Sequence, residues 1–490
     1  MKFERLVAAI AFLGVAAMSV RVSTDGDTFW HLRAGEWILE HGQVLTTDPF
    51  SLTRNGQPWE YPGWLAEIAL DGAFQGLGYA GLNLLTAASV VLALALLWPL
   101  LEGPTLLRAF VLLLAAITSA VYWSARPQIF SFALTAAFLL VLEKWRAGGI
   151  RRVWVLPVLM ALWANLHGGF AIGFLLLFVY LAGVLIELGR EALFGGVALQ
   201  DAWSGKRAEI LGLVAAGLLS AVAVGLNPHG PVMLLYPFRT VSIGVLQDYI
   251  QEWQSPNFHR LEVQPFLWML LLGALVFALS TRPKRPTELI AFLGFAAMGL
   301  LAGRNIALFA LVAAPSVARH AGSALEPITR WIRRGKDVPA GAARLLNTTL
   351  FVLALVAAAL KIALPLGSQV NAQAIGDRLP VAAVDWIREH RPPGPLFNSY
   401  NWGGYVLWAL YPDYPTFVDG RTDLFDDAIL NDYLETWRGG PGWEEVFARW
   451  DIRLALLEPG APLVLALEAS GWESLYEDDQ AIVLGRPEQQ

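Results

Sequence analysis

The chain alternates long apolar segments with short polar loops over roughly its first 370 residues. A hydrocarbon layer about 30 Å thick is crossed by a helix of about 20 apolar residues, so such segments predict membrane-spanning helices. We predict a polytopic α-helical membrane protein with about 11 spans. The predicted spans are residues 6–22, 79–101, 106–122, 128–143, 153–165, 168–188, 208–226, 264–281, 287–302, 305–318 and 347–366. The pairs at 153–188 and 287–318 are each also compatible with one long kinked helix.

Lys and Arg in the loops predict the orientation of these spans. They gather in alternate loops, for example at 144–152 and 282–285, and short loops rich in these residues face the cytoplasm. With the N-terminus inside, the C-terminal tail lies outside, and we expect an integral protein of the plasma (inner) membrane. Lys2 and Arg5 before the first apolar segment also fit a signal peptide. We expect that segment to be retained as the first span.

The polar and apolar pattern divides the chain into two domains. Residues 1–369 form the predicted membrane body, with long outer loops at 21–78 and 227–263, and residues 370–490 form a soluble outer domain. Strands are expected in that outer domain at 395–399, 416–419 and 453–458 and in a hairpin at 473–485. Helical patterns separate these segments, which predicts a small α/β domain with a mostly parallel sheet.

Composition supports a membrane protein and excludes some chemistry. Only 16% of the 490 residues are charged, against about 25% in an ordinary soluble domain. Cysteine is absent, so disulfides and thiolate metal sites are excluded. The net charge of −6 gives no indication of a nucleic-acid partner.

The strongest chemical pattern is Asp25-Gly26-Asp27, directly after the first span. Two carboxylates one residue apart can supply a general base or bind a divalent cation, and oxygen ligands suit Mg²⁺ or Mn²⁺. Gly26 lets the backbone turn tightly enough for both to converge. Glu252, in the second outer loop, is a candidate third metal ligand. The alternative is a solvated loop with a helix-capping Asp.

His31 and Arg33 follow within two helical turns. If this stretch is helical, His31 falls on the same face as Asp27, four residues away. Arg33 is a natural partner for a phosphate group, and we predict that both residues bind substrate. The alternative for Arg33 is an ion pair with an acidic residue of the same loop.

Three further candidates for substrate binding lie at the ends of predicted spans. Arg126 and Arg304 sit at outer ends, where an arginine is costly unless it is paired, so such residues mark ion or substrate sites. Snorkelling to lipid headgroups is the alternative for both. His167 lies in a glycine-flanked break between two spans and is either a ligand or a polar hinge.

Two motifs of the outer domain complete the set. Asn401-Trp402-Gly403-Gly404-Tyr405 precedes a predicted helix, and Phe417-Val418-Asp419-Gly420-Arg421 follows a predicted strand. Paired glycines that open a helix allow backbone N–H groups to approach an anion or a peptide closely. We therefore assign Trp402, Asp419 and Arg421 as candidate substrate-binding residues, with a plain strand-to-helix turn as the alternative.

With these residues assembled, the chain resembles the membrane glycosyltransferases of the GT-C class, such as protein O-mannosyltransferases, aminoarabinose transferases and the oligosaccharyltransferase catalytic subunit. The likeness rests on the multi-span body, the acidic motif after the first span and the outer C-terminal domain. It implies transfer of a sugar, with inversion, from a polyprenyl-phosphate donor in the bilayer to a glycan, lipid or protein acceptor. Asp25 or Asp27 would act as base or metal ligand, and Arg126, Arg304 and Arg33 would bind the phosphate.

The resemblance has one important departure. Residues 401–405 are similar in position to the Trp-Trp-Asp-Tyr-Gly motif of oligosaccharyltransferase, but Gly403 stands where its Asp is expected. Recognition of an acceptor sequon therefore does not carry over. Two other functions compete: a transporter or flippase for a lipid-linked or anionic substrate, and a non-catalytic envelope assembly protein.

Overall fold

The computed structural model describes residues 2–148, 150–245, 250–326 and 339–487. Within them, seven helices are long and apolar enough to cross a membrane. These are Tyr79–Leu100, Thr105–Tyr122, Gln128–Gly148, Gly168–Phe194, Leu199–Val224, Gly303–Ala324 and Gly341–Leu366. Shorter apolar helices cover Val153–Leu166, Gln264–Leu279 and Pro286–Leu301, and α1 covers Phe3–Ser19. The predicted apolar segments are therefore helical, while the number of spans and their orientation stay predictions.

The labelled helices of the body follow the predicted segments. They are α4 (Tyr79–Leu97), α5 (Thr105–Ser119), α6 (Gln128–Gly148), α7 (Leu156–Leu166), α8 (Ala171–Phe194), α9 (Leu199–Val224), α12 (Gln264–Leu279), α13 (Pro286–Leu301), α14 (Ile306–Ala324) and α16 (Ala340–Leu366). The pairs at 153–188 and 287–318 are each two helices, separated by short 3₁₀ turns at Gly168–Phe170 and Gly303–Asn305.

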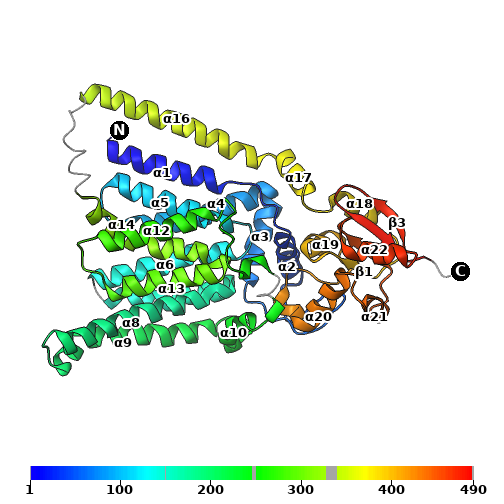
Figure 1. Cartoon of the computed structure of the whole chain (residues 1–490), viewed down its shortest axis with the longest axis horizontal. Coiled ribbons are helices and arrows are strands. Elements are labelled where there is room, and N and C mark those ends of the chain that lie inside the picture. The colour runs from blue at the N-terminus through cyan, green and yellow to red at the C-terminus, as the bar shows by residue number, and fades with distance from the viewer. Residues whose placement is uncertain (1, 149, 246–249, 327–338, 488–490) are drawn as a thin grey trace.

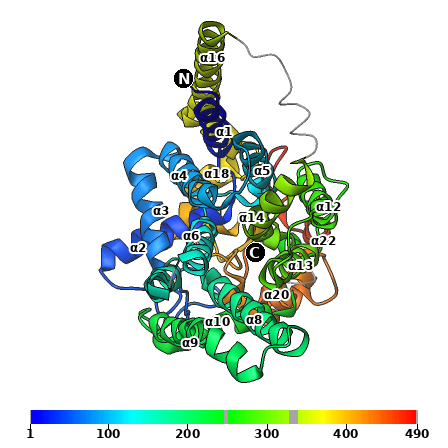
Figure 2. The same cartoon turned by 90° about the vertical axis from the view of Figure 1, so that its left-hand side faces the viewer.

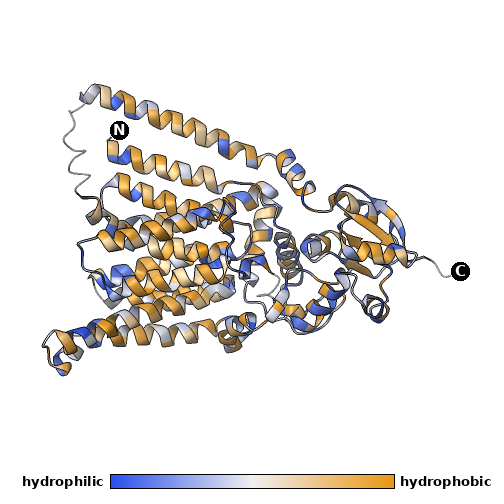
Figure 3. Cartoon of the chain, viewed as in Figure 1, coloured by the Kyte–Doolittle hydropathy of each residue, from blue (hydrophilic) through white to orange (hydrophobic). Residues whose placement is uncertain are grey.

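The long helices run side by side, with the C-terminal sheet beyond one end of the bundle (Figure 1). Seen from the other end, α14 lies inside the bundle, whereas α1 and α16 stand together at its edge (Figure 2). Apolar residues dominate the long helices (Figure 3). Leu353 and Leu360 on α16, for example, are 61% and 66% exposed, as expected for a surface that contacts lipid.

Helix α14 crosses the centre of the bundle because its contact surface is built from small residues. Ala310, Ala313, Ala314 and Ala318 are completely buried there. Small side chains let neighbouring backbones approach closely, which is the main source of packing between helices in a membrane.

The first long outer loop folds into α2 (Asp27–His41) and α3 (Trp64–Leu77), and the second contains α10 (Tyr236–Val241). Helix α2 ends at Gly42, whose left-handed backbone (φ 66°) is the usual helix stop. Helix α2 packs against α3 on one side and against α19 (Gly403–Leu410) on the other. The acidic motif at the start of α2 is thus enclosed between the body and the C-terminal region.

The C-terminal region contains a four-stranded sheet with the order β1-β2-β4-β3. Its strands are β1 (Leu396–Asn398), β2 (Leu454–Leu457), β3 (Glu473–Glu477) and β4 (Ile482–Gly485). Its remaining helices are α17 (Ser368–Gly376), α18 (Val381–His390), α20 (Thr422–Trp437), α21 (Trp443–Arg449) and α22 (Pro462–Ala469). The pair β1–β2 is parallel, whereas β2–β4 and β3–β4 are antiparallel, so the prediction of a mostly parallel sheet is wrong. The terminal hairpin supplies both antiparallel pairs. The division of the chain into domains at residue 370 stays a prediction.

The strand predicted at 416–419 is also wrong. Thr416 forms only an isolated parallel bridge with Ser51 of the first outer loop. The side chain of Asn398 takes the backbone bonds that a neighbouring strand would make, since its Oδ1 accepts from Phe417 N and its Nδ2 donates to Val418 O. Once a side chain satisfies these groups, the segment has no need of a sheet partner.

Candidate functional site

The acidic motif lies where the chain leaves α1 and enters α2. Asp27 is the first residue of α2, and its backbone N–H donates to Asp25 Oδ1 at 3.1 Å. Asp25 thus accepts from the first N–H of α2, although Gly26 rather than Asp25 is the residue at the cap position. The second carboxylate oxygen of Asp25, Oδ2, contacts Arg126.

Three carboxylates from two distant segments meet at Arg126. Arg126 Nη1 lies 3.4 Å from Asp25 Oδ2 and 3.0 Å from Glu252 Oε1, and its Nη2 lies 3.2 Å from Asp27 Oδ2. The Arg126 side chain is 19% exposed. Glu252 belongs to a 3₁₀ turn, Gln251–Trp253, of the second outer loop. Asp25, Asp27 and Glu252, which the sequence suggested as metal ligands, therefore meet Arg126, which it suggested as a phosphate ligand.

The charges of this cluster do not balance, which changes the protonation of its members. Burial raises the pKa of Asp27 to about 7, with Asp25 and Glu252 adding to the effect and Arg126 opposing it. Arg126 lowers the pKa of Glu252, against the effect of burial. Asp27 thus changes its charge near neutral pH, which is the range in which a general base works best.

Two glycine-containing segments of the C-terminal region lie directly on the acidic motif. A Cβ atom added to Gly420 would lie 1.8 Å from Asp27 Oδ1, and one added to Gly404 would lie 2.4 Å from the carbonyl oxygen of Gly26. A Cβ atom on Gly26 would in turn meet the carbonyl oxygen of Asn401 at 2.7 Å. These contacts admit no side chain, so glycine is what allows segments 401–404 and 418–421 to cover Asp27.

Segment 418–421, called the covering loop below, is anchored by a buried triad of charged residues. Arg421 Nη2 and Nε bond Asp419 at 2.7 and 2.8 Å, and Arg421 Nη1 bonds Asp48 Oδ1 at 2.5 Å. Arg421 is 1% exposed, and both carboxylates are fully buried. Although burial opposes its ionisation, Asp48 has a pKa below its ordinary value because of Arg421. Predicted substrate residues Asp419 and Arg421 thus pair with each other and fix the loop to the first outer segment.

Arg304 and His167 border the cluster. The Arg304 guanidinium lies over the Trp253 ring at 4.2 Å and contributes to lowering the pKa of Glu252. His167 Nδ1 lies 2.8 Å from Ser131 Oγ and accepts from Gly169 N at 3.1 Å. These contacts hold the break between α7 and α8, as a polar hinge does.

The remaining predicted residues take part in packing. His31 shares a face of α2 with Asp27, but it is buried, with Nδ1 3.5 Å from Glu67 Oε1 of α3. Arg33 pairs with Glu36 at 2.6 Å and donates to the Trp408 carbonyl at 2.9 Å, which matches the ion-pair alternative. Trp402 is 5% exposed and belongs to the hydrophobic core.

The carboxylates do not fit a metal ion in the observed arrangement. Across residues 2–148, 150–245, 250–326 and 339–487, no group of three or more His, Asp or Glu side chains is placed to hold one. Asp25, Asp27 and Glu252 direct oxygens at Arg126 instead, so the guanidinium occupies the place that a cation would take.

Tyr400 and Asp48 were not predicted as site residues. Burial raises the pKa of Tyr400 well above its ordinary value, and Asp27 adds to this effect. Asp48 anchors Arg421 across 373 residues of sequence. The sequence offers a local signal only for Asp48, whose carboxylate accepts from Phe50 N and Ser51 N as in an Asx turn.

Comparisons with solved structures identify the fold. The sequence matches no protein-family model and no curated protein. The oligosaccharyltransferase AglB from Archaeoglobus fulgidus, in complex with an inhibitory peptide and a dolichol-phosphate, superposes with a TM-score of 0.56 at 13% identity, covering 99% of this chain and 75% of that one. The oligosaccharyltransferase of the same archaeon, tethered to an acceptor peptide with the NVT sequon, superposes with a TM-score of 0.56 at 13% identity. This match covers 93% of this chain and 69% of that one.

A second type of enzyme matches over almost all of both chains. ArnT from Cupriavidus metallidurans, in the apo state, has a TM-score of 0.52 at 14% identity and covers 98% of this chain and 96% of that one. Identities this low establish the fold rather than the reaction. The chain therefore has the fold of the GT-C membrane glycosyltransferases, as its resemblance to that class predicted.

Proposed function

We propose that this protein is a membrane glycosyltransferase that transfers a sugar from a polyprenyl-phosphate donor to an acceptor, with inversion at the anomeric carbon. The observation that carries the proposal is the meeting of Asp25, Asp27 and Glu252 at Arg126, beneath segments 401–404 and 418–421. A carboxylate that titrates near neutral pH and a positive group that can bind phosphate are the two parts such a reaction needs.

Asp27 would accept the proton of the acceptor. As its carboxylate takes this proton, the acceptor oxygen or nitrogen forms a bond with the anomeric carbon from the face opposite the phosphate. The bond between that carbon and the phosphate oxygen breaks, and the phosphate leaves with the electron pair. A positioned base of this kind contributes about 10²- to 10⁴-fold to the rate.

Arg126 and Arg304 would stabilise the departing phosphate. A phosphate that enters the cluster competes with the three carboxylates for the donors of Arg126, and a guanidinium binds phosphate through two parallel bonds. The donor class is supported by the AglB neighbour, which is described in complex with a dolichol-phosphate. Binding of Mg²⁺ or Mn²⁺ by Asp25, Asp27 and Glu252 would require Arg126 to leave these carboxylates. It stays a prediction, which chelation of divalent cations tests.

We further propose that the acidic cluster and the C-terminal region face the extracytoplasmic side of the plasma membrane. The basic loops between the other ends of the helices support this orientation. The acceptor class stays open between glycan, lipid and protein.

The central experiment compares Asp27→Asn with Asp451→Asn, a change at an exposed ion pair with Arg453. Release of polyprenyl phosphate from a panel of polyprenyl-phosphate-linked sugars is measured with the purified full chain and a membrane extract that supplies acceptors. Asp27→Asn should abolish release without changing expression or membrane insertion, and Asp451→Asn should match the unaltered protein. Full turnover by Asp27→Asn would remove Asp27 from the base role.

Donor binding is tested separately with dolichyl phosphate as the probe. Arg126→Ala should weaken its binding at least about tenfold, since a charge-assisted bond contributes about 1.5–3 kcal/mol. Arg260→Ala removes an equally charged residue from an exposed pair with Glu262 and should leave the affinity unchanged. Equal affinities for all three proteins would remove Arg126 from donor binding and leave it the role of holding the three carboxylates together.

A further inference from the structure

A second cluster of charged residues lines a pocket at the other end of the helical bundle. The pocket lies among α6, α8, α13 and α14. Arg146, in the last turn of α6, is one of its members. Helix α6 begins next to Arg126 and has 21 residues, so the two clusters lie about 30 Å apart along it. This distance is about the thickness of the hydrocarbon layer, which puts the pocket at the opposite membrane face.

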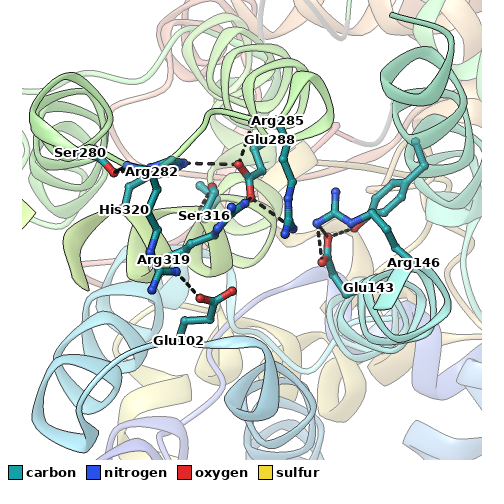
Figure 4. A network of polar contacts seen from close by, with 12 residues as sticks. Glu102, Glu143, Arg146, Ser280, Arg282, Arg285, Glu288, Ser316, Arg319 and His320 are labelled. Carbon is teal, nitrogen blue, oxygen red and sulfur yellow. Dashed lines mark hydrogen bonds and ion pairs between the residues drawn. The ribbon is translucent and has the colours of Figure 1, made fainter. Parts of the chain in front are cut away.

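Three arginines from different segments converge on this pocket. Arg146 Nη2 bonds both oxygens of Glu143 at 3.0 and 2.7 Å, and Arg319 pairs with Glu288. Arg285, directly before α13, reaches only to within 3.8 Å of the Glu288 oxygen that already contacts Arg319. Figure 4 shows its guanidinium between Glu288 and the Glu143–Arg146 pair.

The acidic residues of the pocket do not satisfy these arginines. Glu102 also lines the pocket, but it is paired with Arg282, which does not. Glu143 and Glu288 then face three arginines, Arg146, Arg285 and Arg319, which leaves one positive charge. Arg146 Nη1 is buried and has no hydrogen-bond partner among the described residues. Glu143 also accepts from the hydroxyl of Tyr180, so its oxygens are already shared. An unsatisfied buried donor beside an excess positive charge favours an anionic ligand.

The form of the pocket indicates which anion it suits. The apolar side chains of Leu139, Leu176 and Val312 line it together with the arginines. Basic pockets between membrane helices bind lipid headgroups, and arginine matches the geometry of phosphate oxygens better than lysine does. We propose that this pocket binds a phosphate ester, the chemistry of an anionic phospholipid headgroup, at the membrane face opposite the acidic cluster. The proposal stands independently of the proposed transferase reaction.

The test measures thermal unfolding of the purified full chain in detergent by Trp fluorescence. The probes are dihexanoylphosphatidic acid, inorganic phosphate and, as a ligand without net charge, dihexanoylphosphatidylcholine. A ligand that binds the folded state alone raises the unfolding temperature with its concentration, so each titration yields an affinity. Phosphatidic acid should stabilise the protein at concentrations where phosphatidylcholine has no effect.

Two variants separate the pocket from general surface charge. Arg285→Gln removes a side chain that is 41% exposed and makes only a long ion pair, so the fold should survive. It should weaken binding of the phosphate probe at least about tenfold, and Arg285→Lys should restore part of the loss. Arg190→Gln removes the same charge from an exposed side chain of α8 that does not line the pocket, and should bind like the unaltered protein.

The outcomes are distinct. Binding of phosphatidic acid that is lost in Arg285→Gln identifies a lipid-phosphate site, and equal binding of inorganic phosphate with the same loss identifies a free-phosphate site. Equal stabilisation by phosphatidylcholine, unchanged binding in Arg285→Gln, or no stabilisation by either phosphate probe would overturn the proposal. The network of Figure 4 would then serve only to hold the helices together.

Discussion

The contact between Gly420 and Asp27 can be tested by adding a single methyl group. In Gly420→Ala the new Cβ would begin 1.8 Å from Asp27 Oδ1, whereas real Cβ atoms keep at least 3.0 Å from a neighbour. One partner must therefore move by about 1.2 Å, because repulsion rises steeply below contact distance. The question is which partner gives way.

The covering loop that carries Gly420 is more rigid than the side chain of Asp27. Asp419 and Arg421, on either side of Gly420, belong to the buried triad with Asp48. Asp27 is held at its carboxylate by a 3.2 Å contact with Arg126, and its side chain is 26% exposed. We therefore expect the Asp27 carboxylate to turn away and to lose Arg126. Losing a partly exposed ion pair costs no more than about 1 kcal/mol of the free energy of unfolding.

The cost to activity should be far larger than the cost to stability. A displacement of about 1 Å at a reacting group can lower a rate about 10²-fold. Gly420→Ala should thus reduce sugar transfer by this order while thermal unfolding and dolichyl phosphate binding change little. Gly460→Ala is the matched variant, because Gly460 has no atom within 4 Å of a new Cβ and lies in the same region. Transfer by Gly420→Ala at the rate of Gly460→Ala would refute this account of the covering loop.

Three further predictions rest on the charges of Asp27 and Arg421. Because the pKa of Asp27 is raised to about 7, the transfer rate should rise about tenfold per pH unit below pH 7 and level off above it, as a pH–rate profile would reveal. In the unfolded chain Asp27 has its ordinary pKa of 3.8, so above this pH the folded protein holds a proton on Asp27 that the unfolded chain has lost. The free energy of unfolding therefore declines as the pH rises through 7. Asp27→Asn should abolish that decline, and a decline of equal size in this variant would assign it to another group. Arg421→Met should lower the free energy of unfolding by about 3–5 kcal/mol, since it leaves two buried carboxylates unpaired. Arg453→Met, which breaks an exposed ion pair, should lower the free energy of unfolding by less than about 1 kcal/mol, as measured by chemical denaturation. A similarly small loss for both variants would contradict the structural role of the triad of Asp48, Asp419 and Arg421.

The parts of the structure that the sequence predicted are those with a local signal. The long apolar helices follow from the length of the apolar segments, and the helix at Asp27–His41 with its acidic start follows from neighbouring residues. The meeting of Glu252 with Arg126 joins positions 126 residues apart, and Asp48 meets Arg421 across 373. No periodicity carries such information, because these contacts depend on how whole helices pack. The predicted strand at 416–419 failed for a related reason, since the side chain of Asn398 replaced a sheet partner.

Packing also explains the departure at Gly403, where the oligosaccharyltransferase motif has an Asp. A Cβ on Gly403 would lie 2.3 Å from the Val418 carbonyl oxygen and 2.6 Å from Asp419 Cα. A carboxylate there would push away the loop that carries Gly420 onto Asp27. In this chain the position is therefore used to bring segment 418–421 close to segment 401–404. Gly403, Gly404 and Gly420 all lie so close to a neighbouring segment that no side chain would fit. The C-terminal region therefore covers Asp27 in addition to forming its own sheet.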